Sequence, residues 1–397
     1  MEIWKRNMYI CWFGVLVTST GLNQVTPIIP LYLHELGIKS IEATAEWSGW
    51  ATGICYIIMA LVAPFWGKQA DLHGRKMILL RASFGMALTS LAMGFVQTPL
   101  QFILCRLLQG LVSGFYSGAI TLIATQTPSN QVGWALGMLS TGSVGGILLG
   151  PLFGGYVASI YGLRSIFYVA GALLFIAFAL ILCLIKDNAN SVIDHKPSIK
   201  EVWCNVPQRS IIIAMFISTF IYAVGLMSFQ PVVAIYIYTL MPSTLNLALI
   251  SGAVFSITGV AQIISSSFLG KVIDRIGSEK VIFYSLLITA ATTIPQGYVT
   301  NVYQLSFLRF LLGFGIGGLL PAINAFISKA APVKYAGLIF GYNQAAQFTG
   351  FFIGSIAGSM LVAHDGFRSL FWFTGLLFIA NALWVYRQIY SKNRPIP

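Results

Sequence analysis

Long apolar stretches, each separated from the next by a short polar turn, recur along the whole chain. A helix needs about 20 apolar residues to cross the hydrocarbon core of a bilayer, and these stretches are about that long. Glycine and proline inside them are compatible with membrane helices, because packed neighbours satisfy the backbone groups that they free. The pattern predicts an all-α integral membrane protein with twelve transmembrane helices, at residues 8–33, 47–66, 77–97, 99–122, 133–158, 165–185, 210–238, 246–268, 280–298, 301–327, 335–360 and 367–387.

The connections between these stretches are short, and the longest, residues 186–209, has only 24 residues, which excludes a soluble catalytic domain. Charged residues make up 9% of the chain, against about 25% in soluble domains. The spans hold no cluster of histidines or carboxylates, and the five cysteines have no metal-ligand spacing. We therefore expect no enzyme, no metal site, no cofactor and no disulfide framework. The first apolar run lacks a small-residue cleavage site, so we expect no cleavable signal.

Basic residues are distributed unequally between the two sides of the membrane. If the spans alternate in direction, eighteen of the 23 lysines and arginines fall on one side. Only Lys39, Arg164 and Arg368 fall on the other side, and Arg106 and Arg309 lie inside spans. Cytoplasmic loops carry an excess of Lys and Arg, so both termini are predicted to be cytoplasmic. The net charge of +12 is thereby explained by topology in a lipid bilayer, and we expect no nucleic-acid partner.

The chain contains an internal repeat. Two charged turns, "GKQADLHGRK" and "GKVIDRIGSEK", begin at Gly67 and Gly270, which are 203 residues apart. Seven further pairs of identical residues keep nearly the same offset and the same order, which indicates a duplicated unit. Each unit holds six spans, so the copies enter the membrane in the same orientation, and parallel repeats are one of the arrangements of transporters with alternating access. We expect halves at 1–185 and 210–397, joined by a cytoplasmic linker at 186–209. Further pairs that keep an offset of 203 or 204 are Asp71 with Asp274, Gly74 with Gly277, Arg106 with Arg309, Gly110 with Gly313, Gly137 with Gly341, Gly162 with Gly366 and Arg164 with Arg368.

The first charged turn resembles the cytoplasmic signature of the major facilitator superfamily, Gly-x-Leu-x-Asp-Arg-x-Gly-Arg-Lys. Positions that match it are Gly67, Asp71, Gly74, Arg75 and Lys76. The second copy keeps an acid at Asp274 but has Ser278 and Glu279 in place of the basic pair. The resemblance implies a latch that holds the cytoplasmic side shut. The alternative is that the charges only set topology, which explains Arg75 and Lys76 but not an acid and a glycine in both copies.

The stretch "GMLSTGSVGGILLGPLFGG", residues 137–155, resembles the fifth-span signature of the drug:proton antiporter branch of that superfamily. "GLNQVTPIIP", from Gly21, is similar to the first-span signature of its twelve-span members. The resemblance implies an exporter. Because small residues at this spacing let helices approach closely, ordinary helix packing is the alternative for the glycines. The matching positions are Gly137, Gly146, Gly150, Pro151, Gly154 and Gly155.

Arg106 is the most informative residue inside the membrane, and "RLLQG" from Arg106 resembles the family's fourth-span signature. A cation within a span costs about 2.5–3.5 kcal/mol on insertion scales, so it should face the protein interior and have a partner. It either lines the transport path or ties its helix to backbone carbonyls. In this family spans 1, 4, 7 and 10 line the path, and the polar residues that we place there, with one from span 11, are Asn23, Gln24, Arg106, Ser113, Tyr116, Gln230, Asn324 and Asn343.

No acidic residue lies in the middle of a span. Several proton-driven exporters of the family carry a carboxylate in the first span, where this chain has Asn23 and Gln24. Coupling to protons is therefore an open expectation, and Glu35 and Asp71 are the candidates to carry them. Both could instead be solvated charges at the membrane surface.

Amides and tyrosines among apolar residues suit hydrophobic or amphiphilic small molecules better than phosphates. We therefore predict a monomeric secondary transporter in the bacterial inner membrane that exports such compounds, with protons as the expected coupling ion. A dedicated exporter of one metabolite, such as a siderophore or a sugar, is the alternative. A receptor or scaffold that transports nothing is less consistent with the repeated turns.

Overall fold

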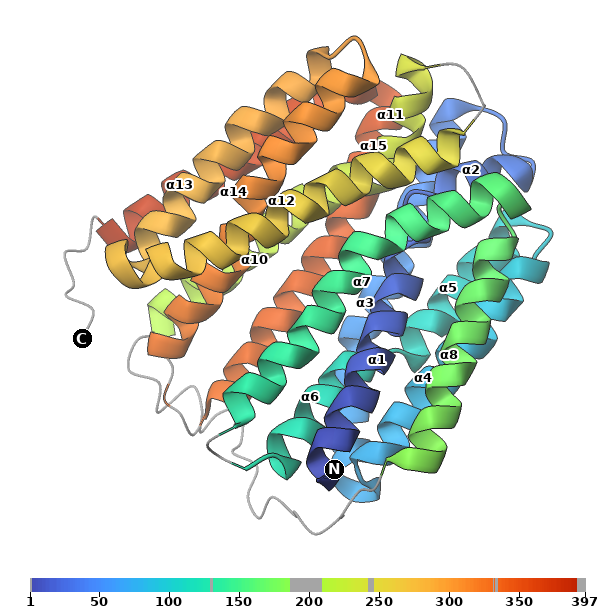
Figure 1. Cartoon of the computed structure of the whole chain (residues 1–397). Helices are drawn as coiled ribbons and strands as arrows, with labels where there is room; N and C mark the ends of the chain where they lie inside the picture. Colours follow the sequence, from blue (N-terminus) through green and yellow to red (C-terminus); the bar gives the residue numbers. More distant parts are fainter. Residues whose placement is uncertain are drawn as a thin grey trace. The chain divides into compact units, whose positions relative to one another are not determined.

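The computed structural model describes residues 2–128, 131–185, 209–241, 246–330, 332 and 335–390, and these residues are almost entirely helical (Figure 1). No strand occurs in these ranges. The predicted linker at 186–209 lies outside the described residues except for Arg209.

The first six predicted spans are all present as helices. The first and the fourth are each interrupted, so that each consists of two helices in succession. The elements are α1 (Ile3–Asn23) with α2 (Ile29–Glu35), α3 (Ile41–His73), α4 (Arg75–Phe95), α5 (Pro99–Val112) with α6 (Phe115–Gln126), α7 (Val132–Tyr161) and α8 (Ser165–Leu184).

The last six predicted spans are also present. Gly366 has a non-helical backbone with φ of 81°, and it divides the long helix α15 into the last two spans. Nine helical segments of the described residues are long and apolar enough to cross a membrane on their own, and one of them, Leu338–Gln388, holds both of these spans. The elements are α10 (Arg209–Phe229) with η1 (Gln230–Val232) and α11 (Val233–Leu240), α12 (Leu247–Ile276), α13 (Ser278–Thr293) with η2 (Ile294–Tyr298), α14 (Val302–Ala330), and α15 (Ala336–Val385) with the π-helical η4 (Tyr386–Tyr390).

The chain forms two compact units. Unit 1 consists of Met1–Ser40, Trp50–Asp194 and Ser243–Ser256, and unit 2 consists of Ile41–Gly49, His195–Pro242 and Ile257–Pro397. In unit 1, α1 packs against α6, α7 and α8, and α4 packs against α5, α6 and α8. In unit 2, α10 packs against α15, and α13 packs against α14 and α15. The division into halves at 1–185 and 210–397 is a statement about the sequence repeat and stays a prediction.

Matched contacts in the two units reproduce the sequence repeat. In unit 1 the Tyr32 hydroxyl donates a hydrogen bond to the backbone carbonyl of Met93, at 2.7 Å. In unit 2 the Tyr236 hydroxyl donates to the backbone carbonyl of Gln296, also at 2.7 Å. The tyrosines are 204 residues apart and their acceptors are 203 apart. The two units therefore repeat not only a set of helices but also a specific contact between them.

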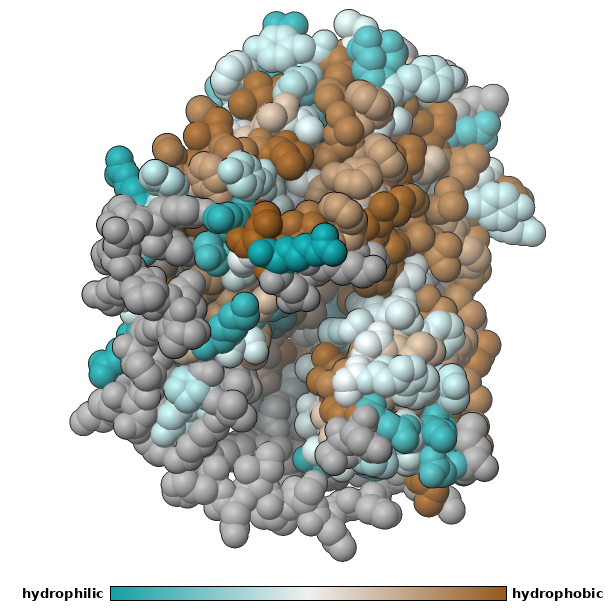
Figure 2. Space-filling model, turned by 60° about the vertical axis from the view of Figure 1, so that its left-hand side comes forward, coloured by the Kyte–Doolittle hydropathy of each residue, from teal (hydrophilic) through white to brown (hydrophobic). Residues whose placement is uncertain are grey.

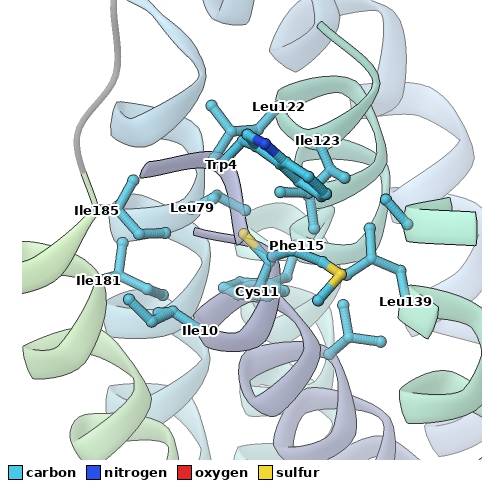
Figure 3. Close-up of a cluster of buried hydrophobic side chains, with 14 of the residues drawn as sticks. Trp4, Ile10, Cys11, Leu79, Phe115, Leu122, Ile123, Leu139, Ile181 and Ile185 are labelled. Carbon is cyan, nitrogen blue, oxygen red and sulfur yellow. The ribbon is translucent and has the colours of Figure 1, made fainter. Parts of the chain in front are cut away.

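An apolar core fastens α1 inside unit 1. Side chains of α1, including Trp4 and Cys11, meet Leu79 of α4, Phe115 of α6 and Leu139 of α7 (Figure 3). All five are buried. Because α6 begins at Phe115, this core anchors the first residue of α6 against α1. The start of α6 is thus held by packing, a point that matters for the break between α5 and α6.

Large apolar side chains also cover the outside of the protein. Leu61 is 68% exposed and Phe95 is 69% exposed. Figure 2 shows hydrophobic residues over a broad part of the visible face. Contiguous apolar surface of this extent is unusual for a protein in water and marks contact with a membrane or a partner. Together with the apolar helices, it identifies a multi-pass membrane protein.

Candidate transport path and gates

In each of the two charged turns, a single glycine separates two helices. Gly74 has φ of 83° and precedes α4, and Gly277 has φ of 92° and precedes α13. Only glycine adopts such angles without strain, which explains why both copies have it. Asp71 and Asp274 lie in the last turns of α3 and α12, but their side chains are outside the described part of the structure. The latch therefore stays a prediction.

The basic residues of the first turn have contacts of their own. Arg75 is 7% exposed, and its Nη1 donates a hydrogen bond to Thr125 Oγ1 of α6 at 3.1 Å. Lys76 Nζ donates to the backbone carbonyl of Leu182 in α8 at 2.9 Å. Gly67, by contrast, is exposed and has open space around it. The basic pair thus ties the start of α4 to two neighbouring helices, in addition to any role in topology.

Arg106 is buried and has two hydrogen-bond partners in the protein. It is 2% exposed. Its Nε donates to the backbone carbonyl of Ala51 in α3 at 3.0 Å, and its Nη1 donates to Gln109 Oε1 at 2.6 Å. Hydrogen bonds of this kind offset the cost of a cation in the membrane. The contacts agree with the alternative in which Arg106 ties its helix to a backbone carbonyl.

Arg309, its counterpart in unit 2, is held differently. It is 3% exposed, and its guanidinium lies 4.1 Å from the ring centroid of Phe229. Its Nε and Nη2 have no hydrogen-bond partner among the described residues. Leu312 stands at the position that corresponds to Gln109, 203 residues earlier, so the amide acceptor is missing from the second copy. A cation–π contact replaces part of that interaction.

The fourth span is interrupted beside two predicted path residues. Ser113 and Gly114 separate α5 from α6, and Gly114 has φ of 111°. The Ser113 hydroxyl donates to the carbonyl of Gly110 at 2.8 Å and is buried. Tyr116 is partly exposed, and its hydroxyl lies 3.4 Å from that of Ser140 on α7. Tyr116 is thus accessible, whereas the Ser113 hydroxyl is occupied within its own helix.

The two amides of the first span make contacts inside unit 1. Asn23 Nδ2 donates to the carbonyl of Ser19 at 2.8 Å, one turn earlier. Gln24 is buried, and its Nε2 donates to the carbonyl of Ile166 in α8 at 3.3 Å. Gln24 therefore joins the end of α1 to α8, which is the helix-to-helix role of such residues.

In unit 2 the structure brings together two predicted path residues from different helices. Asn343 Nδ2 of α15 donates to Asn324 Oδ1 of α14 at 3.3 Å. On α15, Gln344 Nε2 also donates to Gln347 Oε1 at 2.9 Å. Gln230 lies in η1, where the seventh span is interrupted, and is not part of this group. The structure thus places one amide pair between α14 and α15 and a second pair on α15, and their contact with a substrate stays a prediction.

Three glycines of the predicted antiporter signature form a close contact with α1. A methyl group at Gly154 would lie 2.7 Å from Gln24 Cβ, which is too close for any side chain. The same spacing recurs in unit 2, where a methyl group at Gly350 would lie 2.7 Å from Ala223 Cβ of α10. Gly137, in contrast, has no neighbour within 4 Å. The corresponding sets, each facing the first helix of its unit, are Gly146, Gly150 and Gly154 on α7, and Gly350, Gly354 and Gly358 on α15.

Pro151 and Gly155 occupy another face of α7, within unit 1. A methyl group at Gly155 would lie 2.5 Å from the carbonyl of Ala248, at the start of α12. Ser256 Oγ donates to the carbonyl of Leu148 at 2.8 Å. Proline inside a helix removes one backbone donor and bends the helix. The signature thus combines positions that contact α1 with positions that contact the first turns of α12.

Glu35, one of the two proton candidates, has a cationic partner. Arg164 Nε donates to Glu35 Oε1 at 2.9 Å, and Arg164 Nη1 donates to the carbonyl of Gly94 at 3.3 Å. The hydrogen bond with Glu35 raises the pKa of the Arg164 guanidinium. Both side chains are well exposed, so the pair contributes little to stability. The sequence pattern did not predict this pair, because nothing in a single chain indicates that residues 129 positions apart meet.

The chain is similar over nearly its whole length to known bacterial proteins. It is 41% identical over 392 residues to "Multidrug resistance protein MdtG" of Proteus mirabilis (strain HI4320), with 98% of each chain covered. It is 39% identical over 391 residues to the MdtG of Salmonella arizonae, covering 98% of this chain and 97% of that protein. It is also 39% identical to the MdtG of Salmonella typhi over 394 residues, covering 99% and 98%.

Solved structures share the fold at low identity. A bacterial homologue of the human lysosomal transporter Spinster, inward-facing and occupied, superimposes with a TM-score of 0.81 at 12% identity, with 100% of both chains covered. The human organic anion transporter MFSD10 superimposes with a TM-score of 0.74 at 15% identity, covering 97% of this chain and 100% of that chain.

The helices, the duplicated turns and the apolar exterior are those of a multi-pass membrane protein built from two repeats of six spans. Sequence features of the Major Facilitator Superfamily match residues 11–254 and 215–397. The chain belongs to that superfamily, as the sequence resemblance predicted, and it is therefore a transporter of small molecules and not an enzyme.

Proposed function

We propose that the protein exports hydrophobic or amphiphilic small molecules, including drugs. The observation that carries the proposal is the identity of about 40% over nearly the full length with proteins named for multidrug resistance. The residues of the predicted path support it, because they include five amides, a serine and a tyrosine but no acid. A site with neutral donors and acceptors among apolar side chains accepts varied compounds.

Alternating access between two states is the mechanism that parallel repeats support. In this mechanism the turns around Gly74 and Gly277 close the cytoplasmic side, with Asp71 and Asp274 as the latching acids. Within unit 2, the amide pair of Asn324 and Asn343 is the polar contact that we propose for the substrate.

Protons are the coupling ion that the antiporter signature supports. Glu35 and Asp71 are the proposed carriers. For Glu35 the ion pair supports a physical link between protonation and structure, because a neutral carboxyl would no longer attract Arg164. The release would loosen α2 from the turn between α7 and α8, where Arg164 lies.

The distribution of basic residues supports a location in the bacterial inner membrane with both termini in the cytoplasm. We also propose that the protein functions as a monomer, because each unit has its own buried core and paired units suffice for alternating access.

Overproduction in a bacterial strain that lacks its main exporters tests the function. We expect raised resistance to several chemically unrelated amphiphiles, and purified protein in liposomes should drive their efflux with a pH gradient but not with a sodium gradient. Resistance to one compound only would support a dedicated metabolite exporter. No effect with any compound, from protein that is inserted normally, would contradict export.

A further inference from the structure

The interruption of the fourth span leaves carbonyl oxygens without helical partners. α5 ends at Val112, and Ser113 is extended with ψ of −178°. Gly114 follows with φ of 111°, and α6 begins at the next residue. The last carbonyl groups of a helix have no intrahelical donor, so the oxygens of Leu111 and Ser113 need donors from elsewhere. In a membrane such groups are expensive to leave unpaired.

Arg81 and Trp66 supply these donors. Arg81 Nη2 donates to the carbonyl of Ser113 at 2.8 Å, and Nη1 is 3.4 Å from the carbonyl of Leu111. Trp66 Nε1 also donates to the carbonyl of Leu111, at 2.8 Å. The Arg81 guanidinium lies over the Trp66 ring, 3.5 Å from its centroid, so the cation is held by stacking as well as by hydrogen bonds. All four residues belong to unit 1.

The second copy of the repeat lacks both the donors and the break. Tyr284 corresponds to Arg81 and Leu269 corresponds to Trp66, each 203 residues later. Neither can donate a charged or indole N–H to a freed carbonyl. Gly317 corresponds to Gly114, yet it lies inside the helix α14, which runs from Val302 to Ala330. The glycine alone therefore does not interrupt the span, whereas the break occurs in the copy that has the arginine and the tryptophan.

We propose that Arg81 is a positioning residue for transport, which holds the interrupted fourth span at the angle that presents Tyr116 to the path. Interrupted helices in transporters commonly direct the carbonyls at such a break to a bound cation. Here the guanidinium is a cation tethered to α4 that takes this place, so the break is held without a dissolved ion. The carbonyls that Arg81 contacts lie along the chain between the buried Arg106 and Phe115, which packs in the apolar core of unit 1.

The inference rests on the proposed function only for its transport readout, so the experiment also measures local structure. The variants are Arg81→Gln, Arg81→Lys and Arg81→Ala, with Tyr284→Gln as the matched control from the second copy. Hydrogen–deuterium exchange of residues 111–118 reports the break directly. Turnover and KM for an exported amphiphile report transport. Methylguanidinium is added to Arg81→Ala as a replacement cation at about 10 mM, enough to fill most of a site with a Kd of about 1 mM.

We expect Arg81→Gln to exchange faster at 111–118 and to lose turnover at least about tenfold, as for a lost charge-assisted hydrogen bond, with little change in KM. Arg81→Lys should show exchange and turnover between those of Arg81→Gln and the unmodified protein, because an ammonium cannot both reach two carbonyls and stack flat on Trp66. Methylguanidinium should slow exchange in Arg81→Ala, and Tyr284→Gln should match the unmodified protein.

Unchanged exchange at 111–118 in Arg81→Gln, or wild-type turnover with increased exchange, would overturn the inference. If the unmodified protein exports no compound, the proposed function fails, and exchange together with its reversal by methylguanidinium still decides whether Arg81 holds the break. If Arg81→Ala does not fold, Trp66→Phe replaces it: this variant keeps the stacking ring and loses only the N–H, and it should show a smaller increase in exchange at the same residues.

Discussion

Arg106 donates a hydrogen bond to the backbone carbonyl of Ala51, 3.0 Å away on another helix, whereas Arg309 in the second copy lies against the Phe229 ring, and its Nε and Nη2 have no hydrogen-bond partner in the described part of the chain. The same residue type at equivalent positions therefore has two different environments. Removing a buried cation that has hydrogen-bond partners leaves those partners unsatisfied and destabilises the fold. A buried cation without such partners itself destabilises the fold.

This difference predicts opposite effects of one substitution. Arg106→Met should lower the free energy of unfolding of the detergent-solubilised protein by about 1.5–3 kcal/mol, the contribution of a hydrogen bond to a charged group. Arg309→Met should leave stability unchanged or raise it. Each variant is the other's control, since both replace arginine with a side chain of similar length. Equal losses in both would contradict the assignment of partners.

Transport should separate the roles of Arg106 further. If it lines the path, Arg106→Ala inserts normally and loses most efflux, because the substrate loses a contact. The comparison is efflux per inserted molecule against Gln109→Ala, which removes the acceptor but keeps the cation. Wild-type efflux in Arg106→Ala would leave only the structural role.

The ion pair of Glu35 and Arg164 predicts a specific change in pH dependence. The hydrogen bond with Glu35 raises the pKa of Arg164. A raised pKa of a base means that its contribution is present at lower pH and disappears only above the pKa, so Arg164 stays charged from about pH 5 to 9. A shift of the efflux pH profile over that range in Glu35→Gln must then come from the carboxyl. Arg164→Gln keeps the carboxyl and removes only its partner, so its efflux should still depend on pH over this range, whereas Glu35→Gln should lose that dependence. A profile that is unchanged in Glu35→Gln would remove Glu35 as a proton carrier.

The repeated glycine contacts predict matched destabilisation. Gly154→Ala and Gly358→Ala each force a methyl group against the first helix of a unit, at Gln24 and Ser228 respectively. Each should cost about 1–3 kcal/mol in thermal stability, the usual price of overpacking. If the fifth-span signature has a role in coupling, only Gly154→Ala should also uncouple efflux from the pH gradient in liposomes. Equal coupling in both variants would reduce the signature to helix packing.

The charged turns predict unequal effects of removing their acids. Asp71 lies in the last turn of α3, so the latch hypothesis requires its carboxylate to contact the N-terminus of a neighbouring helix. Such a contact contributes about 0.3–1 kcal/mol when exposed and up to about 2 kcal/mol when partly buried. Two states separated by a few kcal/mol would shift several-fold on its loss. Asp71→Asn should therefore raise cysteine labelling at the cytoplasmic ends of spans 2 and 11, which are the end of α3 and the start of α15. Asp274→Asn should raise the labelling less than Asp71→Asn does, because Ser278 and Glu279 replace the basic pair in the second turn. Equal labelling in Asp71→Asn and the unmodified protein would leave the turn as a topology signal.

Much of this protein could be predicted from its sequence, because a bilayer imposes constraints that act along a single chain. Its thickness requires apolar stretches of a certain length, and each of the twelve stretches that the sequence predicts coincides with a helix or a pair of helices. The glycines at 74 and 277 were matched by their offset, and their positive φ explains why no other residue stands there. The family signatures can likewise be recognised from the intervals between their glycine, proline and charged residues.

Tertiary structure decided which polar groups meet. The partners of Arg106, the pairing of Glu35 with Arg164 and the contact of Asn324 with Asn343 depend on how each helix is rotated about its axis and which neighbour it faces. Arg81 shows the limit most clearly. In the sequence it is one more basic residue near the cytoplasm. The break between α5 and α6 frees the carbonyl oxygens of Leu111 and Ser113. Only the folded chain shows that Arg81 reaches these oxygens, which belong to residues 30 and 32 positions away in the sequence.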